Sequence, residues 1–340
     1  MKQRAVMGFG IVLSIVLLIY ALRDISPSEL LYHFRQAHVW LLIAATVAST
    51  FTFALRAIRW RLLLAPAAGA LPFSSRWATV NIGFMTNNLL PARIGEFARA
   101  YSLSRIEPVT VSAALASLVV ERLFDSVIML GLLVPAYVAL GAEELAQIGP
   151  LRALVLGLIA LVAVGVVVLG LTVRFPDRVL GIVDHLSGRL PARFTRPARR
   201  LRDMLESFIG GLGALRHGHV IAKVFAWSLV VWLWNAFSFY LGFLAFDIVE
   251  PGFTGAMFVQ GVIGPFVALP SSPGFFGPFE AAARLSLEMY AIEPSKIVSF
   301  AVTYHILTFL PVTVLGIWYM RKLGIRRAEF SGGVADEAAP

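Results

Sequence analysis

Residues 87–99 read Asn87-Asn88-Leu89-Leu90-Pro91-Ala92-Arg93-Ile94-Gly95-Glu96-Phe97-Ala98-Arg99, and they gather polar and charged side chains inside an otherwise very apolar chain. Pro91 suits the first turn of a helix, because its missing N–H would have no partner there anyway. Its ring disfavours the continuation of a helix that arrives through Leu90. The sequence therefore predicts a break at Pro91, with a helix on either side of it.

The helix predicted after this break has two unlike faces. Helical periodicity places apolar residues on one side and Arg93, Glu96 and Arg99 on the other. The charges alternate in sign, which allows i,i+3 ion pairs on a solvated face just outside the membrane. A site for an anion is the other interpretation, and this stretch alone leaves both open.

A second stretch repeats the same order of an apolar run, Leu-Pro, Gly and Glu. It reads Leu269-Pro270-Ser271-Ser272-Pro273-Gly274-Phe275-Phe276-Gly277-Pro278-Phe279-Glu280. Pro278 suits a helix start, and Glu280 and Arg284 follow on one face. Two Gly/Pro-interrupted segments in corresponding halves of an apolar chain indicate a transporter-like site. A helix start at membrane depth turns N–H groups and positive dipole toward an anion, such as a lipid phosphate.

The composition is that of a polytopic membrane protein. The 340 residues are 58% hydrophobic and 14% charged, and the mean hydropathy of +0.79 is far above that of a soluble domain. The absence of Cys excludes disulfides and thiolate sites. His217 and His219 are close in sequence but do not share a helix face, so we expect no metal site and no cofactor. The net charge of +9 does not indicate nucleic-acid binding, because the Arg residues lie at the ends of apolar runs.

Apolar runs predict about six full membrane crossings. They are residues 8–22, 39–57, 127–140, 151–173, 224–246 and 297–320. Basic residues before the first run resemble a signal peptide, but no small-residue cleavage site follows, so we interpret this run as a crossing. By the positive-inside rule, the Arg and Lys residues place both termini in the cytoplasm, and we expect the protein in the inner (cytoplasmic) membrane of the cell.

Two further segments are predicted to be re-entrant hairpins. Trp77–Leu90 is too short and polar for a crossing of about 20 residues, and Arg residues flank it on both sides. We expect residues 77–105 to enter from the cytoplasm and residues 253–290 to enter from outside. The prediction is an all-α protein with one transmembrane domain, residues 1–325, in an inverted-repeat arrangement. A disordered cytoplasmic tail is expected at residues 326–340.

Residues 109–140 are too long for one simple span, since a helix of that length would measure about 48 Å against a hydrocarbon core of about 30 Å. Glu121, Arg122 and Asp125 interrupt the run at ion-pair spacing, and we expect the helix to divide there. A separate Arg-rich stretch, residues 174–223, is predicted to be a cytoplasmic loop with an amphipathic helix after Pro197. That helix suits either an anionic inner leaflet or packing against the spans.

These motifs resemble the transmembrane region of the lysylphosphatidylglycerol synthase family, a flippase-like membrane domain that also occurs free-standing. The resemblance covers nearly the whole chain. It rests on Leu-Pro-x-Arg-x-Gly-Glu-x-x-Arg at residues 90–99, Glu-Arg-x-x-Asp at residues 121–125, and the Pro/Gly-rich residues 270–280. His305 departs from the expected pattern, which has Arg there.

The resemblance implies translocation of a lipid or a lipid-linked substrate. In fused members the domain flips the aminoacylated lipid that a separate soluble domain makes. Only about twenty residues follow the last predicted crossing, so we expect no aminoacyl transfer by this chain.

The leading hypothesis is a non-enzymatic translocase that binds an anionic or polyprenyl-phosphate-linked headgroup between the two hairpins. The candidate contacts are Asn88, Pro91, Arg93, Glu96, Arg99, Glu121, Arg122, Asp125, Ser271, Ser272, Gly274, Gly277, Glu280 and His305. Glu96, Glu121 and Glu280 could carry coupling protons, because carboxylates at membrane depth are costly unless they are functional or paired. The alternative is ion pairing of Glu96 with Arg93 or Arg99, of Glu121 with Arg122, and of Glu280 with Arg284.

Two other functions compete with this hypothesis. A membrane-embedded transferase acting on a lipid-linked donor would want an acidic metal-binding group, for which Glu121 and Asp125 are the only comparable pair. Arg122 between them favours ion pairing instead. A scaffold for lipid-modifying enzymes would dock its partner on the amphipathic helix at residues 197–215.

Overall fold

The structure, a computed structural model, describes residues 2–90, 94–139, 149–187 and 195–325. Within these ranges it consists of thirteen α-helices and short 3₁₀ segments, with no strand, which confirms the all-α prediction. The predicted tail at residues 326–340 lies outside the described residues.

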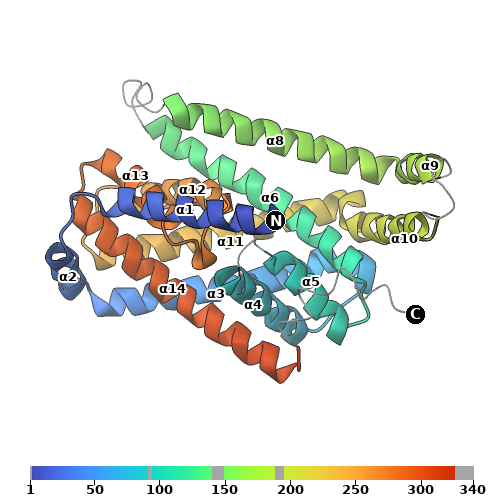
Figure 1. The fold of residues 1–340 in the computed structure, drawn as a ribbon, viewed down its shortest axis with the longest axis horizontal. Helices are drawn as coiled ribbons and strands as arrows, with labels where there is room; N and C mark the ends of the chain where they lie inside the picture. The colour runs from blue at the N-terminus through green and yellow to red at the C-terminus, as the bar shows by residue number, and fades with distance from the viewer. Residues whose placement is uncertain (1, 91–93, 140–148, 188–194, 326–340) are drawn as a thin grey trace.

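The α-helices follow the chain in an order that Figure 1 shows from blue to red. They are α1 (Lys2–Leu22), α2 (Pro27–Gln36), α3 (Val39–Ala68), α4 (Phe73–Leu89), α5 (Gly95–Ile106), α6 (Val111–Ala139), α8 (Gly149–Arg174), α9 (Pro176–Ser187), α10 (Thr195–Gly211), α11 (Gly218–Ala245), α12 (Gly252–Ala268), α13 (Pro278–Leu287) and α14 (Pro294–Lys322). The 3₁₀ segments are η3 (Leu212–Arg216), η4 (Pro273–Phe275) and η5 (Glu288–Tyr290).

The chain is an integral membrane protein with several apolar helices. Among the described residues, α3, α11 and α14 are long and apolar enough to cross a membrane. Two bent pairs, α1 with α2 at 74° and α8 with α9 at 90°, raise the number to five if each pair is one span. The six predicted crossings fall on α1, α3, α6, α8, α11 and α14, but the number six and the inverted repeat stay predictions.

Both predicted hairpins coincide with pairs of short helices. The first consists of α4 and α5, and the second consists of α12, η4 and α13, with α13 starting at Pro278 as predicted. The break at Pro91 falls between described segments, so Pro91 and Arg93 lie outside the described residues. The tip of the second hairpin packs against the first, because η4 contacts α4.

Helix α4 packs closely against α5 and α14 at glycine residues. A Cβ atom on Gly95 would lie on the carbonyl oxygen of Gly83, and the Gly95 N–H donates to Asn87 Oδ1 at 2.7 Å. On the other side of α4, a Cβ atom on Gly316 would collide with Met85. Such contacts allow helices to pack tightly where the hydrophobic effect does not hold them together in lipid.

The first helix packs on the second hairpin. The Ser272 N–H donates to Ser14 Oγ at 2.8 Å, and Gly277, at φ +97°, lies against the Ser14 carbonyl, where no Cβ atom would fit. Arg284 Nη1 donates to the carbonyls of Tyr20, Ala21 and Arg23 at 2.9–3.2 Å. Arg284 thereby caps the C-terminal end of α1, where a cation is favoured.

Helix α2 lies against the start of α14. A capping box of Ser26 and Glu29 begins α2, and His33 Nε2 lies 3.0 Å from Ser295 Oγ. The Ser295 hydroxyl also donates to Glu293 at 2.5 Å, and this hydrogen bond lowers the pKa of the Glu293 carboxyl. These contacts hold α2 against the first turn of α14.

Two boundaries differ from the predictions. The expected division of residues 109–140 near Glu121 is wrong, because α6 is continuous through this position. The second predicted crossing does not end near Ala57, because α3 continues to Ala68. Arg56 and Arg59 consequently lie inside a helix and not at its end. In both cases the charged side chains find partners on neighbouring helices, so the backbone need not break or end.

The amphipathic helix predicted after Pro197 is present as α10 and η3. Its Ile209 and η3 Leu212 are buried, and α10 packs on α6. Leu201 and Met204 on the same helix are exposed. Part of the apolar face thus packs against the spans, while another part is free for the membrane surface.

We expect the Gly316→Ala substitution to destabilise the protein, because the added methyl group overlaps Met85 and Asn81 across the α4–α14 contact. Overpacking of this kind costs about 1–3 kcal/mol. The matched control is Gly131→Ala, since a Cβ atom at Gly131 meets nothing within 4 Å. Thermal unfolding in detergent, followed by tryptophan fluorescence, should show a lower midpoint for Gly316→Ala alone. Equal midpoints would contradict the close packing.

Candidate functional site: a buried cluster of arginines and carboxylates

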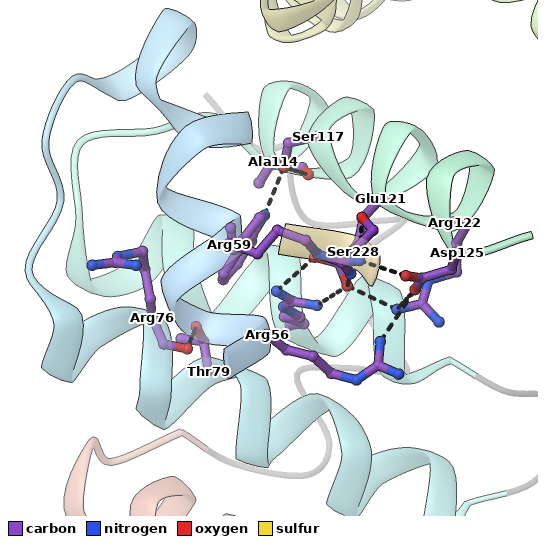
Figure 2. Close-up of polar contacts among 12 residues, drawn as sticks. Arg56, Arg59, Arg76, Thr79, Ala114, Ser117, Glu121, Arg122, Asp125 and Ser228 are labelled. Carbon is purple, nitrogen blue, oxygen red and sulfur yellow. Dashed lines mark hydrogen bonds and ion pairs between the residues drawn. The ribbon is translucent and has the colours of Figure 1, made fainter. Parts of the chain in front are cut away.

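Six charged side chains from three helices meet inside the helical bundle (Figure 2). We call them the arginine cluster. Its members are Arg56 and Arg59 of α3, Arg99 of α5, and Glu121, Arg122 and Asp125 of α6. The i,i+3 and i,i+4 spacings place the charged residues of α3 and of α6 on helix faces that point toward each other.

Asp125 joins α3 to α6. Its Oδ1 accepts hydrogen bonds from Arg59 Nη1 at 2.5 Å and from Trp232 Nε1 of α11 at 2.9 Å. Its Oδ2 accepts from Arg56 Nη1 at 3.1 Å and lies 3.4 Å from Arg122 Nη2. This carboxylate therefore links side chains from three different helices.

Glu121 joins α5 to α6. Arg99 donates to both of its oxygens, with Nη1 2.9 Å from Oε1 and Nη2 3.2 Å from Oε2. Arg122 Nη2 donates to Oε1 at 2.8 Å, and Arg59 Nη2 lies 3.3 Å from the same oxygen. The predicted pairing of Glu121 with Arg122 is confirmed, and two further arginines share this carboxylate.

Aromatic rings complete the surroundings of the guanidinium groups. The Arg99 guanidinium lies 3.8 Å from the centre of the Trp60 ring, and Trp60 donates through Nε1 to Ser117 Oγ at 2.8 Å. Arg56 lies 5.5 Å from the centre of the Phe84 ring and 5.1 Å from that of Trp232. Cations over aromatic faces are stabilised without adding negative charge.

The cluster holds more positive than negative charge. Four guanidinium groups face two carboxylates, and the electrostatic interaction of Glu96 with Arg122 leaves an excess of at least one positive charge. Nε of Arg59, Arg99 and Arg122 also has no hydrogen-bond partner among the described residues. Buried charges without compensation are costly. An anion bound here would supply the missing charge and acceptors.

The cluster has one exposed edge. The side chains of Arg59, Arg99 and Glu121 are at most 3% exposed, whereas that of Arg122 is 39% exposed. Arg122 therefore reaches from the buried carboxylates to the surface of the bundle. An anion that approaches the cluster would meet Arg122 first.

The second hairpin holds a separate buried pair. Glu280, fully buried, accepts the Gly277 N–H through Oε2 at 2.7 Å, while its Oε1 lies 2.7 Å from His305 Nδ1. The expected pairing of Glu280 with Arg284 is wrong, since Arg284 pairs with Glu288 at 2.6 Å and caps α1. The anion at the start of α13 is thus the protein's own carboxylate.

The remaining candidates of the second hairpin form its turn. Gly274, at φ +75°, and Gly277, at φ +97°, adopt backbone conformations that glycine tolerates best. Ser272 Oγ donates to the Phe276 carbonyl at 3.2 Å, and its N–H bonds to Ser14. Ser271 lies beside Gly10 of α1. Contact of these residues with a headgroup stays a prediction.

The candidates of the first hairpin separate into two groups. Arg99, for which a solvated face and an anion site were both open, is buried and belongs to the arginine cluster, and among the described residues no ion pair joins it to Glu96. Asn88 forms a different contact and donates through Nδ2 to Thr313 Oγ1 of α14 at 2.8 Å. Sequence analysis thus found four members of the cluster, Arg99, Glu121, Arg122 and Asp125.

It missed Arg56 and Arg59, which we assigned to the cytoplasmic end of a crossing. A signal was present, because Leu62, Leu63 and Leu64 continue the apolar helix beyond them. Basic residues with apolar helix on both sides indicate intramembrane charge and not a helix end. Trp232 and Ser228, which bind Asp125 and Arg59, carry no comparable sequence signal.

Comparison with known proteins identifies the family. The profile of the lysylphosphatidylglycerol synthase TM region matches residues 7–316. The chain belongs to this family. The arginine cluster and the second hairpin both lie within the matched range of this lysylphosphatidylglycerol synthase TM region, and no solved structure matches the chain.

Individual relatives share about a quarter of their aligned residues with the chain. The chain is 26% identical to the glycosyltransferase AglD of Haloferax volcanii over 95% of its own length, but it spans only 55% of that relative. It is 25% identical to a UPF0104 membrane protein of Methanothermobacter thermautotrophicus, over 89% of the chain and 90% of the relative. Free-standing membrane proteins of similar length thus occur among the relatives.

We expect Asp125→Asn to destabilise the fold, because it leaves Arg56 without its carboxylate partner and Arg59 with Glu121 alone. Removal of one partner from a buried ion pair typically costs about 3–5 kcal/mol. The matched control is Asp184→Asn, which breaks an exposed pair with Arg202 and should leave stability unchanged. The thermal unfolding midpoint in detergent measures both variants. Similar midpoints would show that Asp125 does not hold the cluster together.

Proposed function

We propose that this protein translocates a lipid or a lipid-linked substrate across the membrane and binds its anionic headgroup at the arginine cluster. The observation that supports this proposal is the buried excess of guanidinium groups, with N–H groups for which the described part of the chain offers no acceptor. An ionisable residue at membrane depth is by default a candidate for a substrate pathway. Membership of a family with lysylphosphatidylglycerol synthase TM regions adds to this argument.

The headgroup chemistry that fits is a phosphate. A guanidinium group binds phosphate through two parallel N–H donors. The ammonium group of lysine is a point charge and lacks this paired geometry. The substrate class is therefore an anionic phospholipid or a polyprenyl-phosphate-linked molecule, with its apolar chains in the surrounding lipid. Arg122, at the exposed edge, is the first contact, and the deeper arginines follow.

We propose that the two hairpins form the pathway and that no bond is made or broken. The first hairpin supplies Arg99, and the tip of the second packs against α4 of the first. Glu121 and Asp125 each interact with several arginines. Carboxylates held in this way are poor general bases, because protonation would cost them these interactions.

A transferase is the second candidate, because one relative is named a glycosyltransferase. A transferase that uses a metal-bound lipid-linked donor would need carboxylates free to bind the cation. Here the arginines occupy both carboxylates of the pair that sequence analysis considered. The arrangement therefore favours anion binding over metal binding at this site.

We expect Arg122→Gln to slow lipid movement at least about tenfold, because a charge-assisted hydrogen bond contributes about 1.5–3 kcal/mol. The assay follows fluorescent anionic phospholipids and a short polyprenyl phosphate in proteoliposomes. The matched control is Arg202→Gln, which alters an arginine of α10 outside the cluster and should move lipid at the wild-type rate.

Two results would contradict the proposal. If folded wild-type protein moves no lipid of either class, the translocase function is wrong. If it moves lipid and Arg122→Gln moves it equally fast, the headgroup binds elsewhere. A zwitterionic phospholipid in the same vesicles shows whether the movement depends on headgroup charge.

A further inference from the structure

The buried Glu280–His305 pair lies outside the three helices that carry the arginine cluster. The two residues come from different helices, α13 and α14, and are 0% and 6% exposed. A short contact of 2.7 Å joins Glu280 Oε1 to His305 Nδ1. A fully buried ionisable pair inside a membrane protein is rare and calls for a function.

The groups around this pair can stabilise it with either one or two protons on the imidazole. With neutral imidazole, Nδ1–H donates to the Glu280 carboxylate, and the pair carries one negative charge. With a second proton on Nε2, imidazolium and carboxylate form an ion pair with no net charge. The rings of Phe279 and Phe276, whose centres lie 4.2 and 4.7 Å from that of His305, offer their faces to the cation.

Several ionisable side chains on the helices around the pair have other partners. Arg284 of α13 is held by Glu288 and by the carbonyl groups of α1. Helix α12 contains no ionisable residue, and Arg76, the only charged residue of α4, donates to the carbonyl of Ala57. The ionisable residues of the other adjacent elements are Lys2, Arg4 and Tyr20 in α1, Glu29, Tyr32, His33 and Arg35 in α2, Arg56, Arg59 and Arg61 in α3, His219, Lys223 and Tyr240 in α11, Glu288 and Tyr290 in η5, and Lys296, Tyr304, Tyr319, Arg321 and Lys322 in α14. Tyr304, adjacent in sequence to His305, forms its hydrogen bond with Ser238.

The pair also controls the break in the second hairpin. The Glu280 oxygen that does not face His305 accepts the Gly277 N–H, and Gly277 is the residue at which the chain turns into α13. On the other side of that turn, η4 packs against α4. A change in the charge of the pair therefore acts directly on the hydrogen bond that fixes the turn.

A second connection runs through α14. His305 and Thr313 lie about two turns apart on this helix, and Thr313 accepts a hydrogen bond from Asn88 of α4. Helix α4 packs on α5, which carries Arg99 of the arginine cluster. The pair is thus linked to the first hairpin both through the second hairpin and through α14.

We propose that the Glu280–His305 pair is a proton-binding site that couples proton movement to the movement of the second hairpin. This inference rests on the proposed translocase function and adds its energy source. One proton from water binds to His305 Nε2, the net charge of the pair changes from −1 to 0, and the same proton leaves to the opposite side when the hairpin has moved. Lipid movement then depends on the pH difference across the membrane.

The test uses proteoliposomes with a pH difference of one unit in either orientation and a fluorescent anionic phospholipid. Coupling of one proton to one lipid allows up to about tenfold accumulation, since one pH unit corresponds to about 1.36 kcal/mol. We expect the wild-type protein to accumulate lipid in one leaflet, and in the opposite leaflet when the pH difference is reversed. His305→Gln keeps a side-chain N–H donor for Glu280 but cannot carry the proton, so it should move lipid equally in both orientations.

The matched control is His219→Gln, an exposed histidine at the start of α11. It should respond to the pH difference as the wild-type protein does. A second measurement needs no transport: amide hydrogen exchange of residues 279–281, the first turn of α13, compared at several pH values after correction for intrinsic exchange. Protection there should change with pH in the wild-type protein and not in His305→Gln.

The outcomes separate the two proposals. Lipid movement that ignores the pH difference in the wild-type protein overturns proton coupling and leaves the translocase function intact. No lipid movement, together with pH-dependent protection of residues 279–281, overturns the translocase function and supports the proton site. A His305→Gln protein that still responds to the pH difference overturns the assignment to this pair. If that variant does not fold, Glu280→Gln and the wild-type exchange profile decide the question.

Discussion

The structure depends on one electrostatic constraint, which is that four guanidinium groups, three of them buried, share only two carboxylates. Each carboxylate must therefore serve several arginines at once, and this fixes how α3, α5 and α6 meet. Asp125 also binds Trp232 of α11, so the same constraint reaches a fourth helix. The helices that carry these groups are long, apolar and continuous, because only regular helix satisfies its own backbone in lipid.

Glycine has a different structural role in each of the two hairpins. The first hairpin folds back tightly, since Gly95 has no side chain to separate α5 from Gly83 of α4. The second reverses through a short turn in which Gly274 and Gly277 have positive φ, and the end of this turn is fixed by Glu280. The first hairpin thus places the charged Arg99 beside a tight helix contact. The second contains a turn that depends on the hydrogen bond between Gly277 and Glu280.

Local sequence signals predicted local features well and long-range partners poorly. The helix start at Pro278 follows from a rule about backbone donors and the amphipathic helix after Pro197 follows from apolar periodicity, and both are present. The burial of Arg99 did not follow, because a polar helical stripe has the same pattern whether it faces water or an inner carboxylate. The continuity of α6 through Glu121 was missed for a related reason. A sequence shows the charge of a side chain but not the partner that another helix brings to it.

The guanidinium group of Arg284 has a topological consequence. It bonds to the last carbonyl groups of α1 and to Glu288, and it thereby fastens the beginning of the chain to a helix near its end. Helix α1 consequently belongs in space to the C-terminal half of the protein, although some 250 residues separate them in sequence. The unit that surrounds the second hairpin is assembled from both ends of the chain, so during synthesis α13 receives its neighbour at once, whereas α1 must wait for nearly the whole protein to be made.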